Sequence, residues 1–282
     1  MSAEMGGLTK AAQALGLTQS GMSHIISSLE ADFGFPLLVR NRSGAKLTEA
    51  GEKVLPLIKA IIEKNRVLEN LVQKIRSESS DVIRVAAFTS VAVNWLPGII
   101  KEFQQEYPNV EFKLLNGDYH DIEQWLADGS VDAAFVTMPG PAGFQCVPLC
   151  RDKLMVVMPE GHPLVKQEAV KAADVALYPF ISLLEGSDQD YRRALEKAGV
   201  SPRVKFTTKD DYAILAMVEK GLGITIMPEL LLRGRSARVV IREILPAASR
   251  TIALATSPLD PDRAAARFVS HTAQLVEKNV ND

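Results

Sequence analysis

The first apolar pattern in the chain predicts two short helices joined by a tight turn. Apolar residues recur at helical spacing over residues 8–15 and again over residues 19–32. Gly16 permits a sharp corner between the two segments, and Thr18 can cap the second helix. The outer face of the second helix carries polar side chains, which are Gln19, Ser20, Ser23, His24, Ser27 and Ser28. This pattern predicts a helix-turn-helix whose second helix enters the major groove of DNA, and a plain helical hairpin with a solvated polar face fits the segment equally well.

The next pattern predicts a β-hairpin. Two short strands are expected at residues 37–40 and 45–47, because the turn between them is rich in Asn, Ser and Gly. A hairpin directly after a recognition helix forms a wing beside the DNA. Arg40, Arg42 and Lys46 on this wing can contact phosphates, so the affinity for DNA should fall as the salt concentration rises.

A long helix is predicted from residue 48 to about residue 78. Its apolar residues recur at alternating four- and three-residue steps, which is typical of a dimerising helix, and they are Val54, Ile58, Ile61, Leu68, Val72 and Ile75. Pro56 removes one backbone hydrogen bond and should kink the early part of the helix. Asn65 occupies one of the apolar positions and either fixes the register of pairing or lies at its rim. Residues 76–81, rich in Ser and charge, form the best linker in the chain.

Beyond this linker, short apolar runs alternate with helical segments, which predicts an α/β architecture with mostly parallel strands. The strands are expected at residues 82–88, 110–115, 133–136, 154–158, 224–227 and 251–255. Small ligands should bind at the loops that follow the strand ends. Thr89 and Ser90 follow the first strand and open a helix, where hydroxyls and free N–H groups suit an anionic or carboxylated ligand. Simple capping of that helix explains the two residues equally well.

The composition indicates a globular protein of about two domains. The chain has 282 residues, of which 47% are hydrophobic and 23% charged, and this excludes a disordered or collagen-like protein. The formal charge of −2 by itself identifies no partner. There is no run of 18 uncharged apolar residues and no signal-peptide pattern, so we expect a cytoplasmic protein that is neither secreted nor membrane-spanning.

Chemistry-bearing motifs are absent from the sequence. It contains no Gly-x-Ser-x-Gly elbow, no His-Glu-x-x-His and no phosphate loop, so we expect neither an enzyme nor a cofactor or metal site. Cys146 and Cys150 lie four residues apart on a segment predicted to be extended. Their Cα atoms should be roughly 13 Å apart, which is too far for a disulfide. Buried strand cysteines are therefore favoured over a redox-sensing pair.

Several short motifs, weak one by one, resemble the LysR-type transcriptional regulators when taken in order. At the front these are Thr9-Lys10-Ala11-Ala12, Thr18-Gln19, Ser23, Leu29-Glu30 and Leu47-Thr48-Glu49-Ala50-Gly51. Further along they are Leu96-Pro97 through Tyr107-Pro108, residues 126–134, His162-Pro163-Leu164 and residues 218–228. The last segment is the most diagnostic, because glycines at a helix exit that feed a short buried strand require a specific backbone corner. The resemblance covers nearly the whole chain.

The resemblance implies an all-α winged helix-turn-helix and linker helix, followed by an α/β effector domain of the type 2 periplasmic-binding-protein fold. The implied parts are a DNA-binding domain at 1–47, a dimerising linker helix at 48–78, and two Rossmann-like effector subdomains at 82–157 with 257–282 and at 158–256. It further implies a homodimeric or homotetrameric regulator that binds an interrupted palindrome in double-stranded DNA, takes a small-molecule effector between the subdomains and contacts RNA polymerase. Differential affinity of the effector for two arrangements would be required for switching.

The site residues that the resemblance implies fall into two groups. The DNA contacts are Thr9, Lys10, Gln19, Ser20, Ser23, His24, Arg40 and Arg42. The effector contacts are Thr89, Ser90, Thr137, Glu185 and Ser187. Glu185 would repel a carboxylate if it points inward, which leaves the charge of the ligand open. A solute-binding protein with a non-functional head is the alternative, although it would need an export signal and no winged front.

The chain departs from the family pattern at its front. The family has a helix before the segment that begins at Leu8, and without it we expect Ala12, Leu15 and Ile26 to be exposed. This predicts either a misplaced start or compromised DNA binding. Ser20 stands where many relatives have proline, and His24 and Ser27 stand where many have arginine. These changes predict a different base preference and weaker attraction to phosphates.

Overall fold

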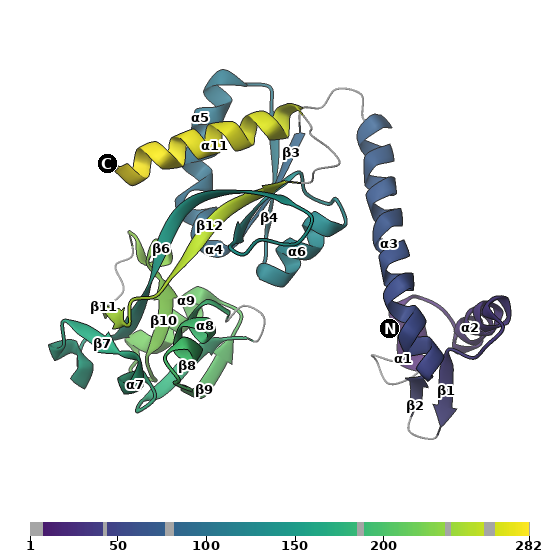
Figure 1. Cartoon of the computed structure of the whole chain (residues 1–282), viewed down its shortest axis with the longest axis horizontal. Helices are drawn as coiled ribbons and strands as arrows, with labels where there is room; N and C mark the ends of the chain where they lie inside the picture. The colour runs from purple at the N-terminus through teal and green to yellow at the C-terminus, as the bar shows by residue number, and fades with distance from the viewer. Residues whose placement is uncertain are drawn as a thin grey trace. The chain divides into compact units, whose positions relative to one another are not determined.

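The computed structural model describes residues 8–41, 44–76, 82–184, 189–234, 238–256 and 263–281. The chain divides into two compact units, Met1–Glu69 and Asn70–Asp282, which we call the N-terminal and C-terminal units. Figure 1 labels the elements of both. No helix among the described residues combines the length and the apolar character that crossing a membrane requires.

The N-terminal unit has the predicted order of elements. It consists of α1 (Leu8–Ala14), α2 (Gln19–Phe33), β1 (Leu38–Asn41), β2 (Gly44–Leu47) and the beginning of α3 (Glu49–Arg76). Gly16 adopts a φ of 67°, which only glycine takes without strain, and so allows the corner between α1 and α2. The Thr18 hydroxyl accepts a hydrogen bond from the Gly21 N–H at 3.1 Å and caps α2. Both predicted turn roles are therefore confirmed.

The side chains of Glu30 and Thr48 hold the chain around the β1–β2 hairpin in place. Glu30 Oε1 on α2 accepts the N–H groups of Leu37 and Leu38 at 2.7 and 3.0 Å. Thr48 Oγ1 donates to the Pro36 carbonyl at 2.8 Å and accepts from the Gly51 N–H at 2.9 Å. A Cβ at Gly51 would lie 2.4 Å from the Leu37 carbonyl oxygen, so only glycine fits there. These contacts explain why glutamate is needed in the Leu29-Glu30 motif and why threonine and glycine are needed in the Thr48-to-Gly51 motif.

The small core of the N-terminal unit corrects one expectation. Ala12 was expected to be exposed but is 1% exposed, because it packs with Ala11 against Met22 of α2. Ile26 is half-buried against the same cluster. Leu15 is 51% exposed, as expected.

Helix α3 runs through Pro56 without interruption, and the predicted kink stays a prediction. Several of its apolar side chains face solvent, since Leu57, Ile61 and Leu68 are 65%, 69% and 58% exposed. Val54, Ile58 and Val72, which share the predicted repeat, are half-buried. Within the part of the chain that the structure describes, α3 therefore has an apolar side that no other element covers.

The C-terminal unit is built on an eight-stranded mixed sheet of order β4-β3-β5-β12-β6-β11-β7, with β10 also paired to β6, and on a separate β8–β9 pair. The strands are β3 (Val82–Ala87), β4 (Glu111–Asn116), β5 (Ala133–Thr137), β6 (Gln145–Pro159), β7 (Ala169–Lys171), β8 (Pro179–Leu183), β9 (Arg203–Thr208), β10 (Thr225–Pro228), β11 (Val239–Leu245) and β12 (Ser249–Thr256). The helices are α4 (Thr89–Asn94), α5 (Leu96–Glu106), α6 (Tyr119–Ala127), the 3₁₀ turn η1 (Pro163–Lys166), α7 (Ala172–Val175), α8 (Gln189–Lys197), α9 (Asp211–Glu219), α10 (Glu229–Leu232) and α11 (Arg263–Asn281).

The α/β class is confirmed, but the expectation of mostly parallel strands is wrong. The pairs β3–β4, β3–β5, β8–β9 and β7–β11 are parallel. The pairs β5–β12, β6–β12, β6–β10 and β6–β11 are antiparallel. The reason is the pair of long strands β6 and β12, which run side by side and enter both parts of the sheet (Figure 1).

Strands β6 and β12 connect two lobes of the C-terminal unit. The first lobe contains β3–β5 with α4–α6 and α11, and its core includes Phe103, Phe135 and Phe268. The second lobe contains β7–β11 with α7–α9, and its cores include Phe180 and Ile181. Strand β12 falls within the range 158–256 expected for the second subdomain, yet it pairs with β5 over Ile252–Thr256. Its later half is therefore part of the first lobe.

Candidate functional site

The outer face of α2 is the candidate DNA-reading surface of the N-terminal unit. Gln19, Ser20 and His24 are exposed and Ser23 is half-buried, whereas Met22 on the opposite face is 5% exposed. Thr9 on α1 is exposed as well. The helix therefore presents short hydroxyls, an amide and an imidazole outward, which are groups that hydrogen-bond base edges and phosphates.

Any positive charge on this surface comes from outside α2, because the sequence of this helix contains no Lys or Arg. Lys46 on β2 is exposed. Arg42 and the side chains of Lys10 and Arg40 lie outside the described residues. Helix α2 itself therefore offers no cationic side chain that could attract DNA phosphates.

The C-terminal unit contains a cavity of about 230 Å³ between its lobes. Thr89 and Ser90 line it, where the sequence analysis expected ligand contacts. Thr137 does not line it, because it ends β5 and pairs with Ile252 of β12. Glu185 and Ser187 lie outside the described residues. The remaining lining comes from both lobes and comprises Phe88, Asn116, Gly117, Asp118, Tyr119, Asp121, Leu154, Leu183, Asp190, Tyr191, Lys209, Asp211, Ile226, Pro228, Leu231 and Arg250.

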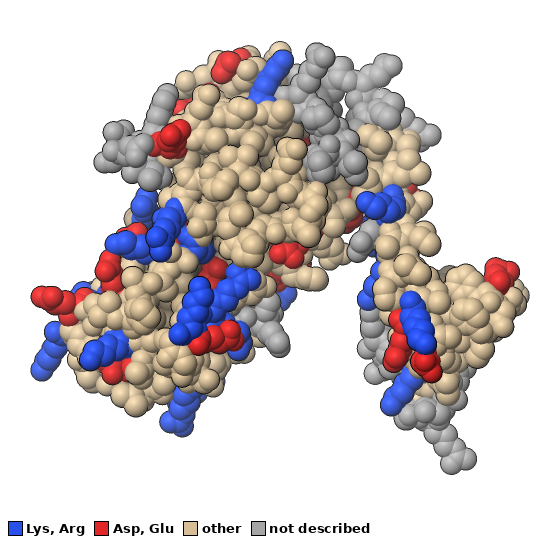
Figure 2. All heavy atoms as spheres, viewed as in Figure 1, with Lys and Arg blue, Asp and Glu red and all other residues tan. Residues whose placement is uncertain are grey.

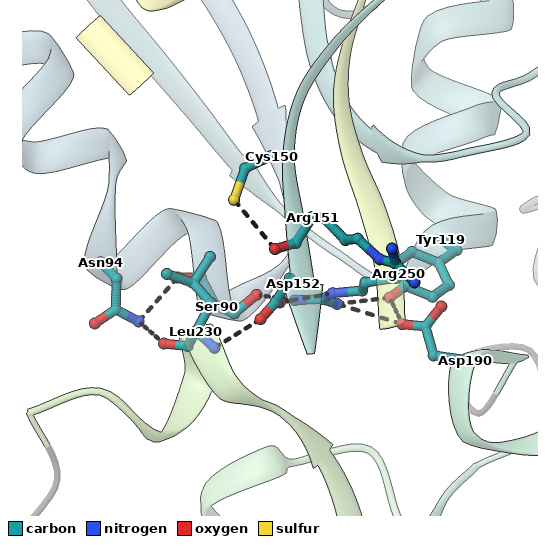
Figure 3. Close-up of polar contacts among 9 residues, drawn as sticks. All are labelled: Ser90, Asn94, Tyr119, Cys150, Arg151, Asp152, Asp190, Leu230 and Arg250. Atoms are coloured by element: carbon teal, nitrogen blue, oxygen red, sulfur yellow. Dashed lines mark hydrogen bonds and ion pairs between the residues drawn. The ribbon is translucent and has the colours of Figure 1, made fainter. Parts of the chain in front are cut away.

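Arg250 is the centre of the polar contacts around this cavity (Figure 3). Its Nε and Nη2 donate to Asp152 Oδ2 at 2.9 and 2.8 Å, and Nη2 also donates to Ser90 Oγ at 2.7 Å. Nη1 donates to the Tyr119 hydroxyl at 2.8 Å and lies 3.4 Å from Asp190 Oδ2. A guanidinium has five N–H donors, and these five contacts engage all of them.

Burial and neighbouring charges set the protonation of this network. Desolvation raises the pKa of the Tyr119 phenol well above its ordinary value, so the hydroxyl keeps its proton. Desolvation also lowers the pKa of Arg250, but the interactions with Tyr119, Asp152 and Asp190 outweigh it and the net pKa is raised. The guanidinium is therefore a permanent buried cation, and its side chain is 5% exposed.

A second layer of hydrogen bonds fixes Asp152. Its Oδ1 accepts the Leu230 N–H of α10 at 2.9 Å. Asn94 Nδ2 donates to the carbonyls of Ser90 and Leu230, both at 2.9 Å (Figure 3). Strands β6 and β12 and helices α4 and α10 are thereby held together at the wall of the cavity.

Three residues of the second lobe, Asp190, Asp211 and Lys209, make polar contacts across the cavity. Asp190 on α8 accepts a hydrogen bond from the Tyr119 hydroxyl in addition to its contact with Arg250. Asp211 on α9 interacts with the Thr89 side chain, which lowers the pKa of this carboxyl, but burial outweighs that interaction and the net pKa is raised. Lys209 Nζ lies 3.9 Å from Asp118 Oδ2. Any ligand in the cavity would have to replace or join these contacts.

Sequence reasoning missed Arg250, Asp190 and Asp211. A signal existed for Arg250, because it is a lone cation near the start of a strand whose later residues are nearly all apolar. Asp190 and Asp211 open helices and were indistinguishable in the sequence from ordinary helix-start carboxylates.

The two cysteines give no sign of a redox pair. Both lie on β6, as the extended segment predicted, and both are free and half-buried rather than fully buried. Burial raises the pKa of both thiols, which disfavours the reactive thiolate. Among the described residues, no group of three His, Cys, Asp or Glu is placed to hold a metal ion.

Comparisons with known proteins match both units. Residues 1–52 match the family model described as "Bacterial regulatory helix-turn-helix protein, lysR family", and residues 76–276 match "LysR substrate binding domain". The chain is 29% identical over 275 residues to an "Uncharacterized HTH-type transcriptional regulator YvbU" of Bacillus subtilis, and the match covers 96% of this chain and 94% of the relative.

Solved structures share the fold. "Crystal structure of full-length CbnR complexed with the target DNA complex" matches with a TM-score of 0.59 and 23% identity, and covers 98% of this chain and 96% of that chain. "Effector binding domain of QuiR in complex with shikimate" matches with a TM-score of 0.64 and 22% identity, and covers 71% of this chain and 99% of that chain.

Proposed function

This chain belongs to the LysR family of transcriptional regulators, and we propose that α2 reads its operator while the cavity of the C-terminal unit holds its effector. The protein is a DNA-binding regulator with an effector-binding domain of the type 2 periplasmic-binding-protein fold. A solute-binding protein is not favoured, because the N-terminal residues match a helix-turn-helix model.

We assign the base contacts to the exposed polar face of α2, and this face is the observation that carries the DNA-reading proposal. Gln19, Ser20, Ser23 and His24 lie on it at successive helical turns, opposite the buried Met22. Thr9 and Lys10 would contact the backbone beside α1, and Arg40 and Arg42 would contact phosphates from the hairpin. A glutamine amide forms a bidentate contact to adenine, so Gln19 is the strongest candidate for sequence discrimination.

We further propose that the regulator acts as a homodimer, which assembles into a homotetramer, on an interrupted palindrome. The support is the exposed apolar side of α3, where Ile61 alone is 69% exposed. Two copies that bury this side would present two reading helices to two half-sites. Its working place is then the cytoplasm, where chromosomal DNA and RNA polymerase are accessible.

The effector would bind between the lobes, against Thr89 and Ser90 on one side and Asp190 and Asp211 on the other. Glu185 and Ser187 precede α8 in the chain and are proposed for the same wall. Asp190 and Asp211 belong to one lobe and their partners to the other, so a ligand that changes these contacts changes the relative stability of two lobe arrangements. That differential affinity is what an effector needs to alter DNA binding.

The test joins DNA and ligand binding in one protein. The purified full chain should shift DNA from upstream of its own gene more strongly than random DNA of equal length. A metabolite screen should find compounds that raise the melting temperature, since a ligand at 100 times its dissociation constant adds about 2.7 kcal/mol. Such a compound should also change the operator affinity. Equal binding to both DNAs in the presence and absence of every stabilising compound would overturn the proposal.

A further inference from the structure

The charges around the cavity are unbalanced. Four acidic side chains line it, Asp118, Asp121, Asp190 and Asp211, against two basic ones, Lys209 and Arg250. By contrast, the outer surface of the second lobe visible in Figure 2 carries numerous Lys and Arg among its Asp and Glu. The face of the second lobe drawn in Figure 2 therefore does not share the acidic excess of the lining.

The two basic residues are poorly placed to receive an anion. Every N–H donor of Arg250 already has an acceptor, and Asp152, which lies behind it, neutralises its charge at 2.8 Å. The side chain of Lys209 is 71% exposed, and water screens its charge there. Among the described lining residues, a carboxylate entering the cavity would meet four like charges and no unengaged buried cation.

Asp211 differs from the other three acids. Asp190 is held by Arg250 and Tyr119, while Asp118 and Asp121 accept each other's backbone N–H groups in a capping box at the start of α6. Asp211 interacts with Thr89, and the charge of Arg250 acts on it without forming an ion pair among the described residues, so burial still raises its pKa. A carboxylate has room for several donors, so Asp211 keeps accepting capacity inside the cavity.

Apolar side chains form much of the remaining wall, with Phe88, Leu154, Ile226 and Leu231 lining it from both lobes. At about 230 Å³ the cavity is smaller than the roughly 300–1,000 Å³ typical of drug-sized ligand pockets. A small, largely apolar body with one hydrogen-bond-donating cation matches this combination of walls and charges.

We propose that the effector of this cleft is a compact amine, whose protonated nitrogen binds the Asp211 carboxylate and whose apolar body lies against Phe88 and Leu231. This deepens the proposed function and rests on it. An ammonium–carboxylate contact in a partly buried site is a charge-assisted hydrogen bond, stronger than one between neutral groups. It would also give Asp211 the ion pair that no described Lys or Arg makes with it.

The experiment compares matched pairs of probes on the full chain. Benzylamine, phenethylamine and cyclohexylamine are tested against benzoate, phenylacetate and cyclohexanecarboxylate, at equal ionic strength, by thermal shift and calorimetry. We expect the amines to raise the melting temperature and the carboxylates to leave it unchanged. In Asp211→Asn the amines should bind at least about tenfold more weakly than in the unaltered chain, because the charge-assisted contact is lost.

A matched control removes the same charge elsewhere. Glu123 is exposed on α6 and does not line the cavity, so Glu123→Gln should bind the amines as the unaltered chain does. Amines that bind equally to Asp211→Asn, or that cause no shift at all, would overturn the inference. Carboxylates that bind the unaltered chain and fail to bind Thr89→Val would also overturn it, while leaving the effector cleft itself in place.

Discussion

Asp190 on α8 and Arg250 on β12 meet across the cavity, with Nη1 3.4 Å from Oδ2, while Asp152 holds the other side of the same guanidinium. Arg250 therefore has two carboxylate partners of different kinds. Asp152 lies on β6, which pairs with the β12 strand of Arg250, and its side chain is 4% exposed. Asp190 lies on α8 of the second lobe, and its side chain is 13% exposed. We therefore expect the Asp152 contact to maintain the fold and the Asp190 contact to be the one that a ligand can replace.

The first prediction compares how much each of the two carboxylates contributes to the stability of the folded chain. Asp152→Asn removes the charge that neutralises a buried guanidinium, and its amide can no longer serve both Arg250 and the Leu230 N–H as an acceptor. Breaking a buried ion pair from one side costs about 3–5 kcal/mol, which urea unfolding should detect as a lower midpoint. Asp190→Asn should cost clearly less, because Asp152 stays in place.

The control for this prediction is the neighbouring residue in the sequence. Lys153 forms an exposed ion pair with Glu243, and Lys153→Gln should leave the unfolding midpoint unchanged within error. An equal loss in Asp152→Asn and Asp190→Asn would show that Arg250 needs both carboxylates, and that Asp190 is not an exchangeable contact.

The second prediction concerns DNA reading. Gln19→Ala should weaken binding to the operator about tenfold or more, because a good bidentate base contact is worth ~1–3 kcal/mol. Binding to random DNA should change little, since that binding comes from phosphate contacts. Fluorescence anisotropy with both DNAs measures the ratio. Gln13→Ala, an exposed glutamine on α1, provides the control. If the ratio of operator to random affinity is the same in both variants, Gln19 reads no base.

Local features of this fold were predictable because they depend on neighbours within a few residues. The Thr18 cap, the Gly16 corner and the hairpin are of this kind, and the apolar runs marked six of the strands correctly. Strands β9 and β11 have no such clean pattern, because their side chains are exposed or half-buried along most of their length, whereas β8 is a buried apolar run that the sequence analysis did not assign to a strand. Ala12 was misjudged because its burial depends on Met22, which lies on the other helix.

The cavity was harder to predict than the elements around it. Its central contact joins Asp152 and Arg250, which are 98 residues apart, and the antiparallel register of β6 and β12 brings them opposite each other. No periodicity in the sequence encodes that pairing. Thr89 and Ser90 follow a clear strand and line the cavity, whereas Thr137, the last residue of an equally clear strand, does not line it.

The third prediction uses pH. Burial raises the pKa of Asp211 in the folded chain, so between its unfolded and folded pKa values the folded state binds more protons. Stability from this group therefore falls as pH rises through that window. Asp211→Asn lacks the penalty, and we expect it to be more stable than the unaltered chain at neutral pH, with the advantage shrinking as pH falls below the folded pKa.

Urea unfolding at a series of pH values measures this difference. Glu123→Gln serves as the control, since its exposed carboxylate lies outside the cavity and the substitution should give no pH-dependent advantage. A loss of stability in Asp211→Asn at neutral pH would mean that the Asp211 carboxylate stabilises the folded chain. Its burial would then give no argument for a cationic ligand beside it.

The fourth prediction concerns the apolar side of α3. Ile61 is 69% exposed, so Ile61→Glu removes little packing within the described chain, and glutamate is as good a helix former as isoleucine or better. If two copies pair through α3, each dimer loses two buried isoleucines, each worth about 1.5–3 kcal/mol, and gains two buried charges. Sedimentation at micromolar concentrations should show that the dissociation constant of the dimer is at least about a hundredfold higher for the variant than for the unaltered chain.

The control is Ala60→Glu, at the adjacent exposed position. This variant should dissociate far less, because it removes almost no apolar area. Identical sedimentation of all three proteins would show that pairing, if it occurs, uses another surface, and the spacing of the two reading helices would then have a different origin.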